Sequence, residues 1–131
     1  MQIEIAHSLS ASDVGSVNSL LRQLVHDPAS YKPIDEATMR EIVGDPKVSV
    51  AVAREEGVLV GMGILYRFNK PRGKYASLED MMVDEAHRRK GIGEAIARRL
   101  IEEARAHGVE TIELSARPSR VPANAIGRAH V

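Results

Sequence analysis

Residues 81–96 read MMVDEAHRRKGIGEAI, and the rest of the chain is interpreted outward from this stretch. An apolar run ends at Val83, a basic loop with Gly91 and Gly93 follows, and an amphipathic pattern then begins. This order predicts a strand that turns sharply into a helix. The unpaired N–H groups and the macrodipole at the start of a helix attract anions, and residues 88–90 are all basic. We therefore predict a phosphate-binding site here.

The composition limits the class of protein. The 131 residues suit a single domain, 1–131, with a sizeable core. Lys plus Arg and Asp plus Glu each number 18, so the formal net charge is zero and no overall field attracts nucleic acid or an anionic membrane. Cysteine is absent and aromatic residues are 3%, which disfavours thiolate metal sites and base stacking. The five histidines have no metal-ligand spacing, so we expect no metal.

The N-terminal residues show no targeting pattern. Residues 1–5 alternate polar and apolar, and they lack the basic and then apolar segments of a signal peptide. We therefore expect a cytoplasmic protein with no membrane span.

The spacing of apolar residues predicts a mixed α/β sheet with helices on both faces. Ser10 and Asp13 form a capping-box pattern before the first helix, and Gly61 and Gly63 indicate a bulge or a close backbone approach. Residues 26–43 lie where a small enzyme could build a substrate lid. We expect strands at 2–6, 48–53, 58–68, 75–83 and 111–114, helices at 10–25, 35–43 and 91–107, and a last helical pattern from 123 to 130.

Three kinds of phosphate-binding loop compete for residues 88–93. A nucleotide P-loop needs Gly-x-x-x-x-Gly-Lys-Ser/Thr, which the chain lacks. A dinucleotide-binding fold needs a third glycine, and Ile96 stands at that position. The pattern Arg88-x-x-Gly91-x-Gly93 resembles the acetyl-coenzyme A (acetyl-CoA) pyrophosphate loop of the GCN5-related N-acetyltransferase (GNAT) superfamily.

The resemblance extends over nearly the whole chain. It includes the first helix, the lid-like second helix, the hairpin and the strand–helix–strand order, together with residues 77–80 before the loop and residues 117–120 and 123–125 after it. It implies the acyl-CoA N-acyltransferase fold, with a mixed, mostly antiparallel central sheet. It also implies transfer of an acetyl group from acetyl-CoA to a primary amine of a small molecule or peptide.

The resemblance also assigns site residues. Acetyl-CoA is the implied cosubstrate, with its pantetheine paired to the backbone of the strand before the loop and its pyrophosphate held by the loop amides and the Arg88 side chain. Asn124 matches a residue that commonly contacts the cofactor in relatives. The implied cofactor-binding residues are Met81, Met82, Val83, Arg88, Arg89, Lys90, Gly91, Ile92, Gly93 and Asn124.

Two adjacent carboxylates, Glu79 and Asp80, are the candidate bases. A free alkylammonium has a pKa of about 10.4, so a base must remove a proton before the amine can attack the thioester. Adjacent residues of a strand point to opposite faces, so we expect only one carboxylate to serve, and we favour Glu79. The alternative is that the pair forms ordinary salt bridges beside Arg72 or Lys74. The basic residues of the loop have an equally ordinary alternative, a solvated strand-to-helix turn.

The sequence departs from the family pattern near its C-terminal end. Gly127 stands where relatives often have a tyrosine that acts as general acid, and the last one or two strands are expected to be missing, as in a truncated family member. The predicted strand at 111–114 would then be an unpaired edge, which favours homodimerisation. The competing function is therefore a weak or inactive relative that binds acetyl-CoA or CoA as a dimeric module. Nucleic-acid binding by residues 88–90 is disfavoured by the zero net charge.

Overall fold

A computed structural model of the chain describes residues 1–114, 129 and 130. The strands are β1 (Gln2–Ala6), β2 (Val48–Glu55), β3 (Val58–Lys70), β4 (Gly73–Val83), β5 (Thr111–Leu114) and β6 (Ala129–His130), and the helices are α1 (Ala11–Leu24), α2 (Glu36–Gly44) and α3 (Ile92–Ala106), with 3-10 turns at Pro28–Ser30 and Glu85–His87. The strands form one sheet in the order β1-β2-β3-β4-β5-β6. Neighbouring strands are antiparallel except β4 and β5, which are parallel. The predicted mixed, mostly antiparallel sheet is confirmed.

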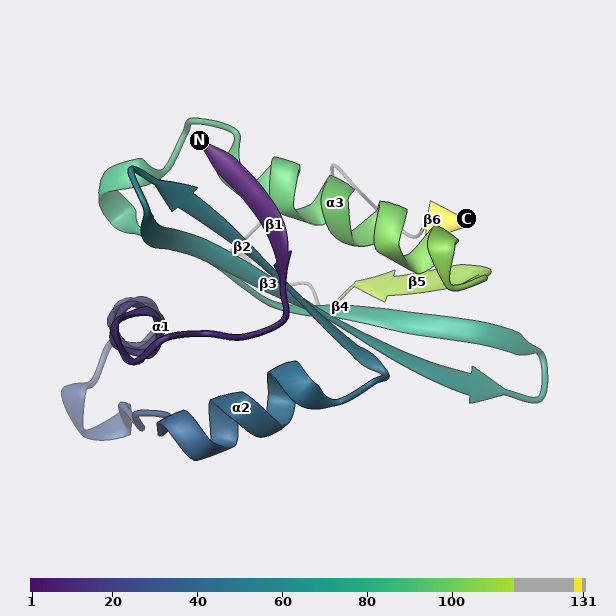
Figure 1. Ribbon diagram of the computed structural model, residues 1–131, viewed down its shortest axis with the longest axis horizontal. Helices are drawn as coiled ribbons and strands as arrows, with labels where there is room; N and C mark the ends of the chain where they lie inside the picture. Colours follow the sequence, from purple (N-terminus) through teal and green to yellow (C-terminus); the bar gives the residue numbers. More distant parts are fainter. Residues whose placement is uncertain (115–128, 131) are drawn as a thin grey trace.

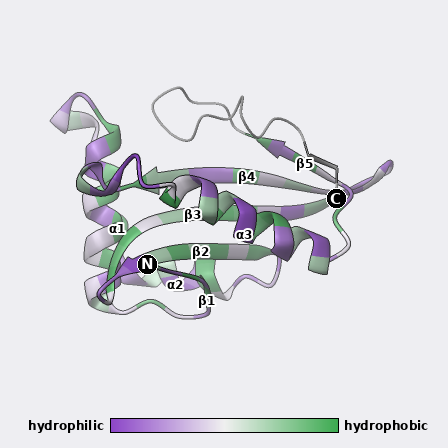
Figure 2. Cartoon of the chain, turned by 90° about the horizontal axis from the view of Figure 1, so that it is seen from above, coloured by the Kyte–Doolittle hydropathy of each residue, from purple (hydrophilic) through white to green (hydrophobic). Residues whose placement is uncertain are grey.

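Helices cover both faces of the sheet, as predicted (Figure 1). We call the two sides the α1–α2 face and the α3 face. On the α3 face, Ile96 and Leu100 recur at helical spacing and are fully buried against the sheet. On the α1–α2 face, Val17 and Met39 anchor their helices to a second core. Figure 2 shows the apolar central parts of β2 and β3 that lie between the two cores. None of the helices described is long and apolar enough to cross a membrane.

The ends of α1 and α2 form as the sequence predicts. The Asp13 backbone N–H donates to Ser10 Oγ at 3.0 Å and the Ser10 N–H donates to Asp13 Oδ2 at 3.1 Å, which completes the capping box. Asp35 caps α2 by accepting from the Thr38 N–H at 2.7 Å. Arg54 of β2 donates to Asp13 at 2.8 Å, and this hydrogen bond holds the pKa of Asp13 below its ordinary value. The ion pair therefore ties the start of α1 to the sheet.

Gly63 lies at an irregularity in the pairing of β3 with β4. Glu79 pairs with Ile64 and Met82 pairs with Met62, so Asp80 and Met81 together face Gly63. This two-against-one arrangement is a β-bulge. A Cβ atom on Gly63 would lie 2.3 Å from Met81 Sδ and 2.9 Å from a side-chain carbon of α3. Both alternatives predicted from the glycines of β3, a bulge and a close approach, are therefore confirmed.

The far edge of the sheet differs from the prediction. Thr111 pairs with His130 and Ile112 pairs with Ala129, so the expectation that all of β5 is an unpaired edge is wrong for these two residues. The physical reason is that exposed strand N–H and C=O groups take a partner when one is in reach, here the last residues of the same chain. A helical pattern was predicted for residues 123–130. Residues 123–128 lie outside the described residues, and residues 129 and 130 are extended rather than helical.

Candidate functional site

The loop between β4 and α3 leaves the first turn of α3 open to an outside anion. Gly91 is the N-cap of α3, with φ of 78°, and it provides no side chain to cap the helix. By contrast, α1 and α2 are capped by their own Ser10 and Asp35 side chains. The first N–H groups of any helix lack partners within it, and they carry partial positive charge. The start of α3 therefore suits an anion, as predicted from the two glycines.

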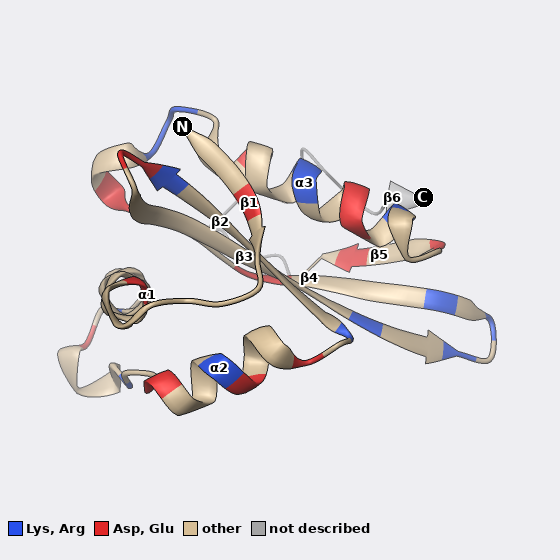
Figure 3. Cartoon of the chain, viewed as in Figure 1, with Lys and Arg blue, Asp and Glu red and all other residues tan. Residues whose placement is uncertain are grey.

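Three basic residues directly precede this helix start. Arg88, Arg89 and Lys90 are exposed, and they form the blue loop before α3 in Figure 3. The Arg88 Nε–H donates to the Val83 carbonyl at 3.1 Å, which folds the side chain back over the end of β4. No carboxylate within the described residues forms a salt bridge with any of the three. Their charge is thus available to a phosphate group.

Contacts from α1 hold the loop in place. The Gln23 side-chain amide donates to Asp84 Oδ1 at 2.9 Å and accepts from the Glu85 backbone N–H at 2.9 Å. His87 Nδ1 lies 2.9 Å from Asp84 Oδ2. The hydrogen bonds from Gln23 first, and from His87 second, lower the pKa of Asp84 below its ordinary value. His87 is half-buried, and its bond to Asp84 makes it part of this support.

The strand that leads into the loop keeps one side free for a ligand. β5 pairs with β4 only from Tyr75 to Leu78. Among the described residues, no strand pairs with Met81–Val83 on the side away from β3, and the Val83 carbonyl accepts the hydrogen bond from Arg88 Nε. The side chain of Met81 packs in the core under α3, whereas that of Met82 packs under α1 and α2. The two methionines are core residues by side chain, and only their backbone faces the open edge.

The two candidate bases lie on the same face of the sheet, which corrects the prediction from alternation. Ser77 Oγ donates to Glu79 Oε2 at 2.7 Å, and Tyr66 Oη donates to Asp80 Oδ2 at 3.3 Å. Asp80 has φ of 56° because it is part of the bulge, so the regular alternation of side chains is interrupted between it and Glu79. Both carboxylates are half-buried on the α1–α2 face.

Neither carboxylate is neutralised by the protein in the part that the structure describes. The predicted alternative, salt bridges to Arg72 or Lys74, is not observed there, and no other described cation pairs with Glu79 or Asp80. Two half-buried carboxylates without a counter-ion are suited to a cationic ligand.

Tyr66 is a site residue that the sequence reasoning missed. The pKa of the Tyr66 phenol is raised to about 12, and burial is the largest cause. The charge of Asp80, the hydrogen bond from Tyr66 to Asp80 and the charge of Glu79 raise it further, in that order. The available signal for Tyr66 was its position in β3: it follows Ile64 by two residues, so the two side chains lie on the same face of the sheet, the α1–α2 face. Asn124 and Gly127 lie outside the described residues.

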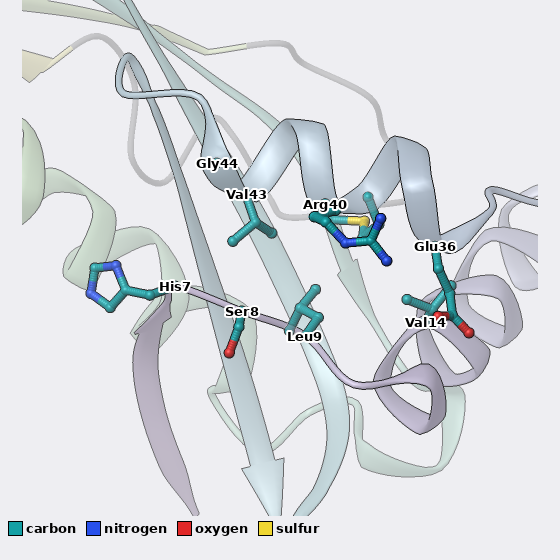
Figure 4. Close-up of a pocket in the computed structure, with 9 residues that line it drawn as sticks. His7, Ser8, Leu9, Val14, Glu36, Arg40, Val43 and Gly44 are labelled. Atoms are coloured by element: carbon teal, nitrogen blue, oxygen red, sulfur yellow. The ribbon is translucent and has the colours of Figure 1, made fainter.

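A separate cavity of about 240 Å³ lies between α2 and the connection from β1 to α1 (Figure 4). Leu9, Val14 and Val43 give it an apolar wall, and Glu36 and Arg40 extend from α2 at its side. It includes none of the predicted site residues. The described residues contain no group of three or more His, Cys, Asp or Glu side chains that could hold a metal ion.

Comparison with known proteins gives one consistent result. The sequence model of the Acetyltransferase (GNAT) family matches residues 17–126. The glucosamine 6-phosphate N-acetyltransferase 1 of Oryza sativa subsp. japonica is 31% identical over 105 residues, which cover 76% of this chain and 64% of that protein. This chain therefore spans slightly less than two thirds of the length of that relative.

Solved structures agree with this match. An aminoglycoside acetyltransferase from an uncultured soil metagenomic sample is 26% identical, with a TM-score of 0.72 over 97% of this chain and 89% of that one. A predicted acetyltransferase from Clostridium acetobutylicum, solved with acetyl-CoA, is 15% identical, with a TM-score of 0.72 over 99% of this chain and 92% of that one. The second likeness concerns the fold alone.

Proposed function

Because the chain belongs to the GNAT acetyltransferase family, we propose that it transfers an acetyl group from acetyl-CoA to a primary amine of a small molecule or peptide. The observation that carries this proposal is the pairing of two sites along one strand. The uncapped, basic start of α3 follows β4, and β4 carries two carboxylates without a described counter-ion. One site suits a phosphate-bearing donor and the other suits an amine.

The residues of the loop fit the pyrophosphate of acetyl-CoA. The backbone N–H groups of residues 89–93 and the Arg88 side chain would hold it, because Gly91 leaves the helix start open and the basic side chains are exposed. The open backbone edge of Met81–Val83 would hold the pantetheine, with Asn124 as a further contact. Acetyl-CoA would supply an activated thioester carbonyl for attack by the amine.

Glu79 is the base in this proposal. Its carboxylate, already hydrogen-bonded to Ser77, takes a proton from the incoming ammonium, directly or through water. Asp80 is the competing candidate, since the bulge places it on the same face. The test is a thiol-release assay with Glu79→Gln and Asp80→Asn. Loss of about 10²–10⁴-fold in kcat for Glu79→Gln supports Glu79, and a larger loss for Asp80→Asn assigns the base to Asp80.

The names of the two relatives suggest where to begin a search for the acceptor. One is a glucosamine 6-phosphate N-acetyltransferase and the other an aminoglycoside acetyltransferase, and both names refer to sugars that carry an amine. The amine panel should therefore begin with amino sugars and then include short peptides. Calorimetry with acetyl-CoA is the matched control, since absence of binding at millimolar ligand contradicts the whole proposal.

The competing proposal is a relative that binds acetyl-CoA or CoA and transfers slowly. It is favoured by Gly127, because glycine has no acid for the thiolate where relatives often have tyrosine. Cofactor binding without thiol release over the panel would support it. A homodimer through the edge near Glu113 and Leu114, which lack a described partner strand beyond β4, is part of this proposal. A clean monomer in size-exclusion chromatography would contradict the dimer.

A further inference from the structure

Four polar side chains from β3 and β4 gather on the α1–α2 face. Tyr66 donates its phenolic hydrogen to Asp80 at 3.3 Å, and Ser77, the direct partner of Tyr66 across the two strands, donates its hydroxyl hydrogen to Glu79 at 2.7 Å. The bulge at Asp80 is what brings the second carboxylate to this side. Each carboxylate is therefore oriented by one hydroxyl group of the protein.

The Tyr66 oxygen and the two carboxylates of this cluster can still accept hydrogen bonds from a ligand. A phenol whose pKa is raised to about 12 stays protonated at neutral pH, so Tyr66 gives its single hydrogen to Asp80 and keeps its oxygen lone pairs. Ionised carboxylates accept hydrogen bonds and donate none. The ligand that complements two carboxylates and a phenolic oxygen carries a positive charge and several N–H donors.

The same raised pKa argues against another role for Tyr66. A thiol has a pKa of about 8.5, so a phenol with a pKa of about 12 is a weak proton donor toward a thiolate. Tyr66 is therefore a poor replacement for the acid that relatives have at the position of Gly127. Its hydroxyl is better suited to bind the acceptor than to protonate the leaving group.

We infer that Tyr66 is an acceptor-binding residue that selects primary amines: its oxygen, oriented by the hydrogen bond to Asp80, accepts one N–H of the substrate's ammonium while Asp80 and Glu79 accept the others. This inference rests on the proposed acetyl transfer. A primary ammonium has three N–H donors for these three acceptors. A secondary ammonium has two, so one acceptor is left without a partner, and that loss lowers affinity.

The first test concerns the cluster itself and needs no activity. The chain has three tyrosines, and absorbance at 295 nm during an alkaline titration follows their ionisation. Tyr66→Phe should remove the step at the highest pH, and Asp80→Asn should move that step to lower pH because a neighbouring negative charge is lost and the acceptor becomes a neutral amide oxygen. If the highest step persists in Tyr66→Phe, or does not move in Asp80→Asn, the cluster is not as described and the inference fails.

The second test measures the acceptor. With D-glucosamine as the probe amine, Tyr66→Phe should raise KM about 10-fold, the loss expected for one hydrogen bond to a charged group, while kcat stays within about threefold. With the N-methylated probe, the two proteins should differ by less than about threefold. The affinity for acetyl-CoA should not change. Tyr75→Phe is the matched control, because it removes the same hydroxyl from a half-buried tyrosine of β4 that stacks on Phe68.

The outcomes separate this inference from the proposed function. Equal KM values for wild type and Tyr66→Phe, with acetyl transfer intact, overturn the role of Tyr66 alone. If the wild type binds acetyl-CoA but transfers to no amine, the proposed function fails, and the inference is judged by calorimetry with D-glucosamine in the presence of CoA. Equal affinity for both proteins, or no binding to the wild type, then overturns it.

Discussion

Replacing Gly63 by alanine tests how tightly α3 and the bulged part of β4 pack on β3. The added Cβ would lie 2.3 Å from Met81 Sδ, 2.9 Å from Ile96 Cγ2 and 3.2 Å from Leu100 Cδ1. Carbon atoms in contact are ordinarily about 3.5–4.0 Å apart, so a buried methionine and a helix must both move. Overpacking of this kind costs about 1–3 kcal/mol. The lower entropy of the unfolded chain offsets about 0.4–1 kcal/mol, so the middle of the two ranges gives a net loss of about 1.3 kcal/mol.

Two other glycines provide matched controls for this prediction. The nearest atom to a Cβ on Gly61 is Ile96 Cδ1 at 3.1 Å, so small shifts suffice and the net change should be close to zero. Gly15 lies in α1 with nothing within 4 Å of the added atom. Its replacement by alanine should stabilise the fold by about 0.5–1 kcal/mol, the difference between the two residues in a helix interior.

The assay is urea unfolding monitored by circular dichroism, and variants are compared by their unfolding midpoints provided that their m-values equal that of the wild type. The expected order of stability is Gly15→Ala, then wild type together with Gly61→Ala, then Gly63→Ala. A Gly63→Ala protein as stable as Gly61→Ala would refute the packing argument, because it would mean that the space opposite the bulge is not filled. Because Met81 follows Asp80 in the bulge, Gly63→Ala should also reduce acetyl transfer in the folded protein.

Three further predictions concern the ion pair, the loop and the phosphate site. Asp13→Asn should lower stability by about 1–2 kcal/mol at pH 7, since it weakens both the capping box and the Arg54 pair. The folded-state pKa of Asp13 is lowered, so the stabilisation that its carboxylate gives is complete above the unfolded-state pKa of about 3.9 and is lost as the pH falls through the folded-state pKa. The difference in urea midpoint between wild type and Asp13→Asn should therefore shrink as the pH falls through that range. A difference that stays constant would contradict the reasoning. Gln23→Leu removes both hydrogen bonds to the loop and should weaken acetyl-CoA binding about fivefold in calorimetry, whereas unchanged affinity would mean that α1 does not organise the site. Arg88→Ala should weaken the same binding about 10-fold, with Arg98→Ala on the outer face of α3 as the control that leaves it unchanged.

Local sequence signals predicted most of the fold. The capping box at Ser10 and the apolar spacing of α3 depend on residues three or four positions apart, so they can be interpreted without knowledge of the tertiary structure. The basic loop with Gly91 was predictable for the same reason, because a strand, a turn and a helix follow one another directly in the chain.

The features that were missed depend on contacts between distant parts of the chain. Alternation placed Glu79 and Asp80 on opposite faces, but a bulge depends on how β4 aligns with β3, and Gly63 was only an indirect signal of it. The bond between Gln23 and Asp84 joins residues 61 positions apart, and polar side chains of this kind give no periodic signal. The pairing of β6 with β5 was missed because two residues are too few for a strand pattern.

The central claim is that the open edge of β4 and the start of α3 bind acetyl-CoA. The most direct measurement is a titration of ¹⁵N-labelled protein with acetyl-CoA, followed by backbone amide shifts. We predict saturable changes that are largest at residues 81–83 and 89–93 and small along α2. No saturable change at millimolar acetyl-CoA, or the largest changes around the cavity beside α2, would contradict the claim.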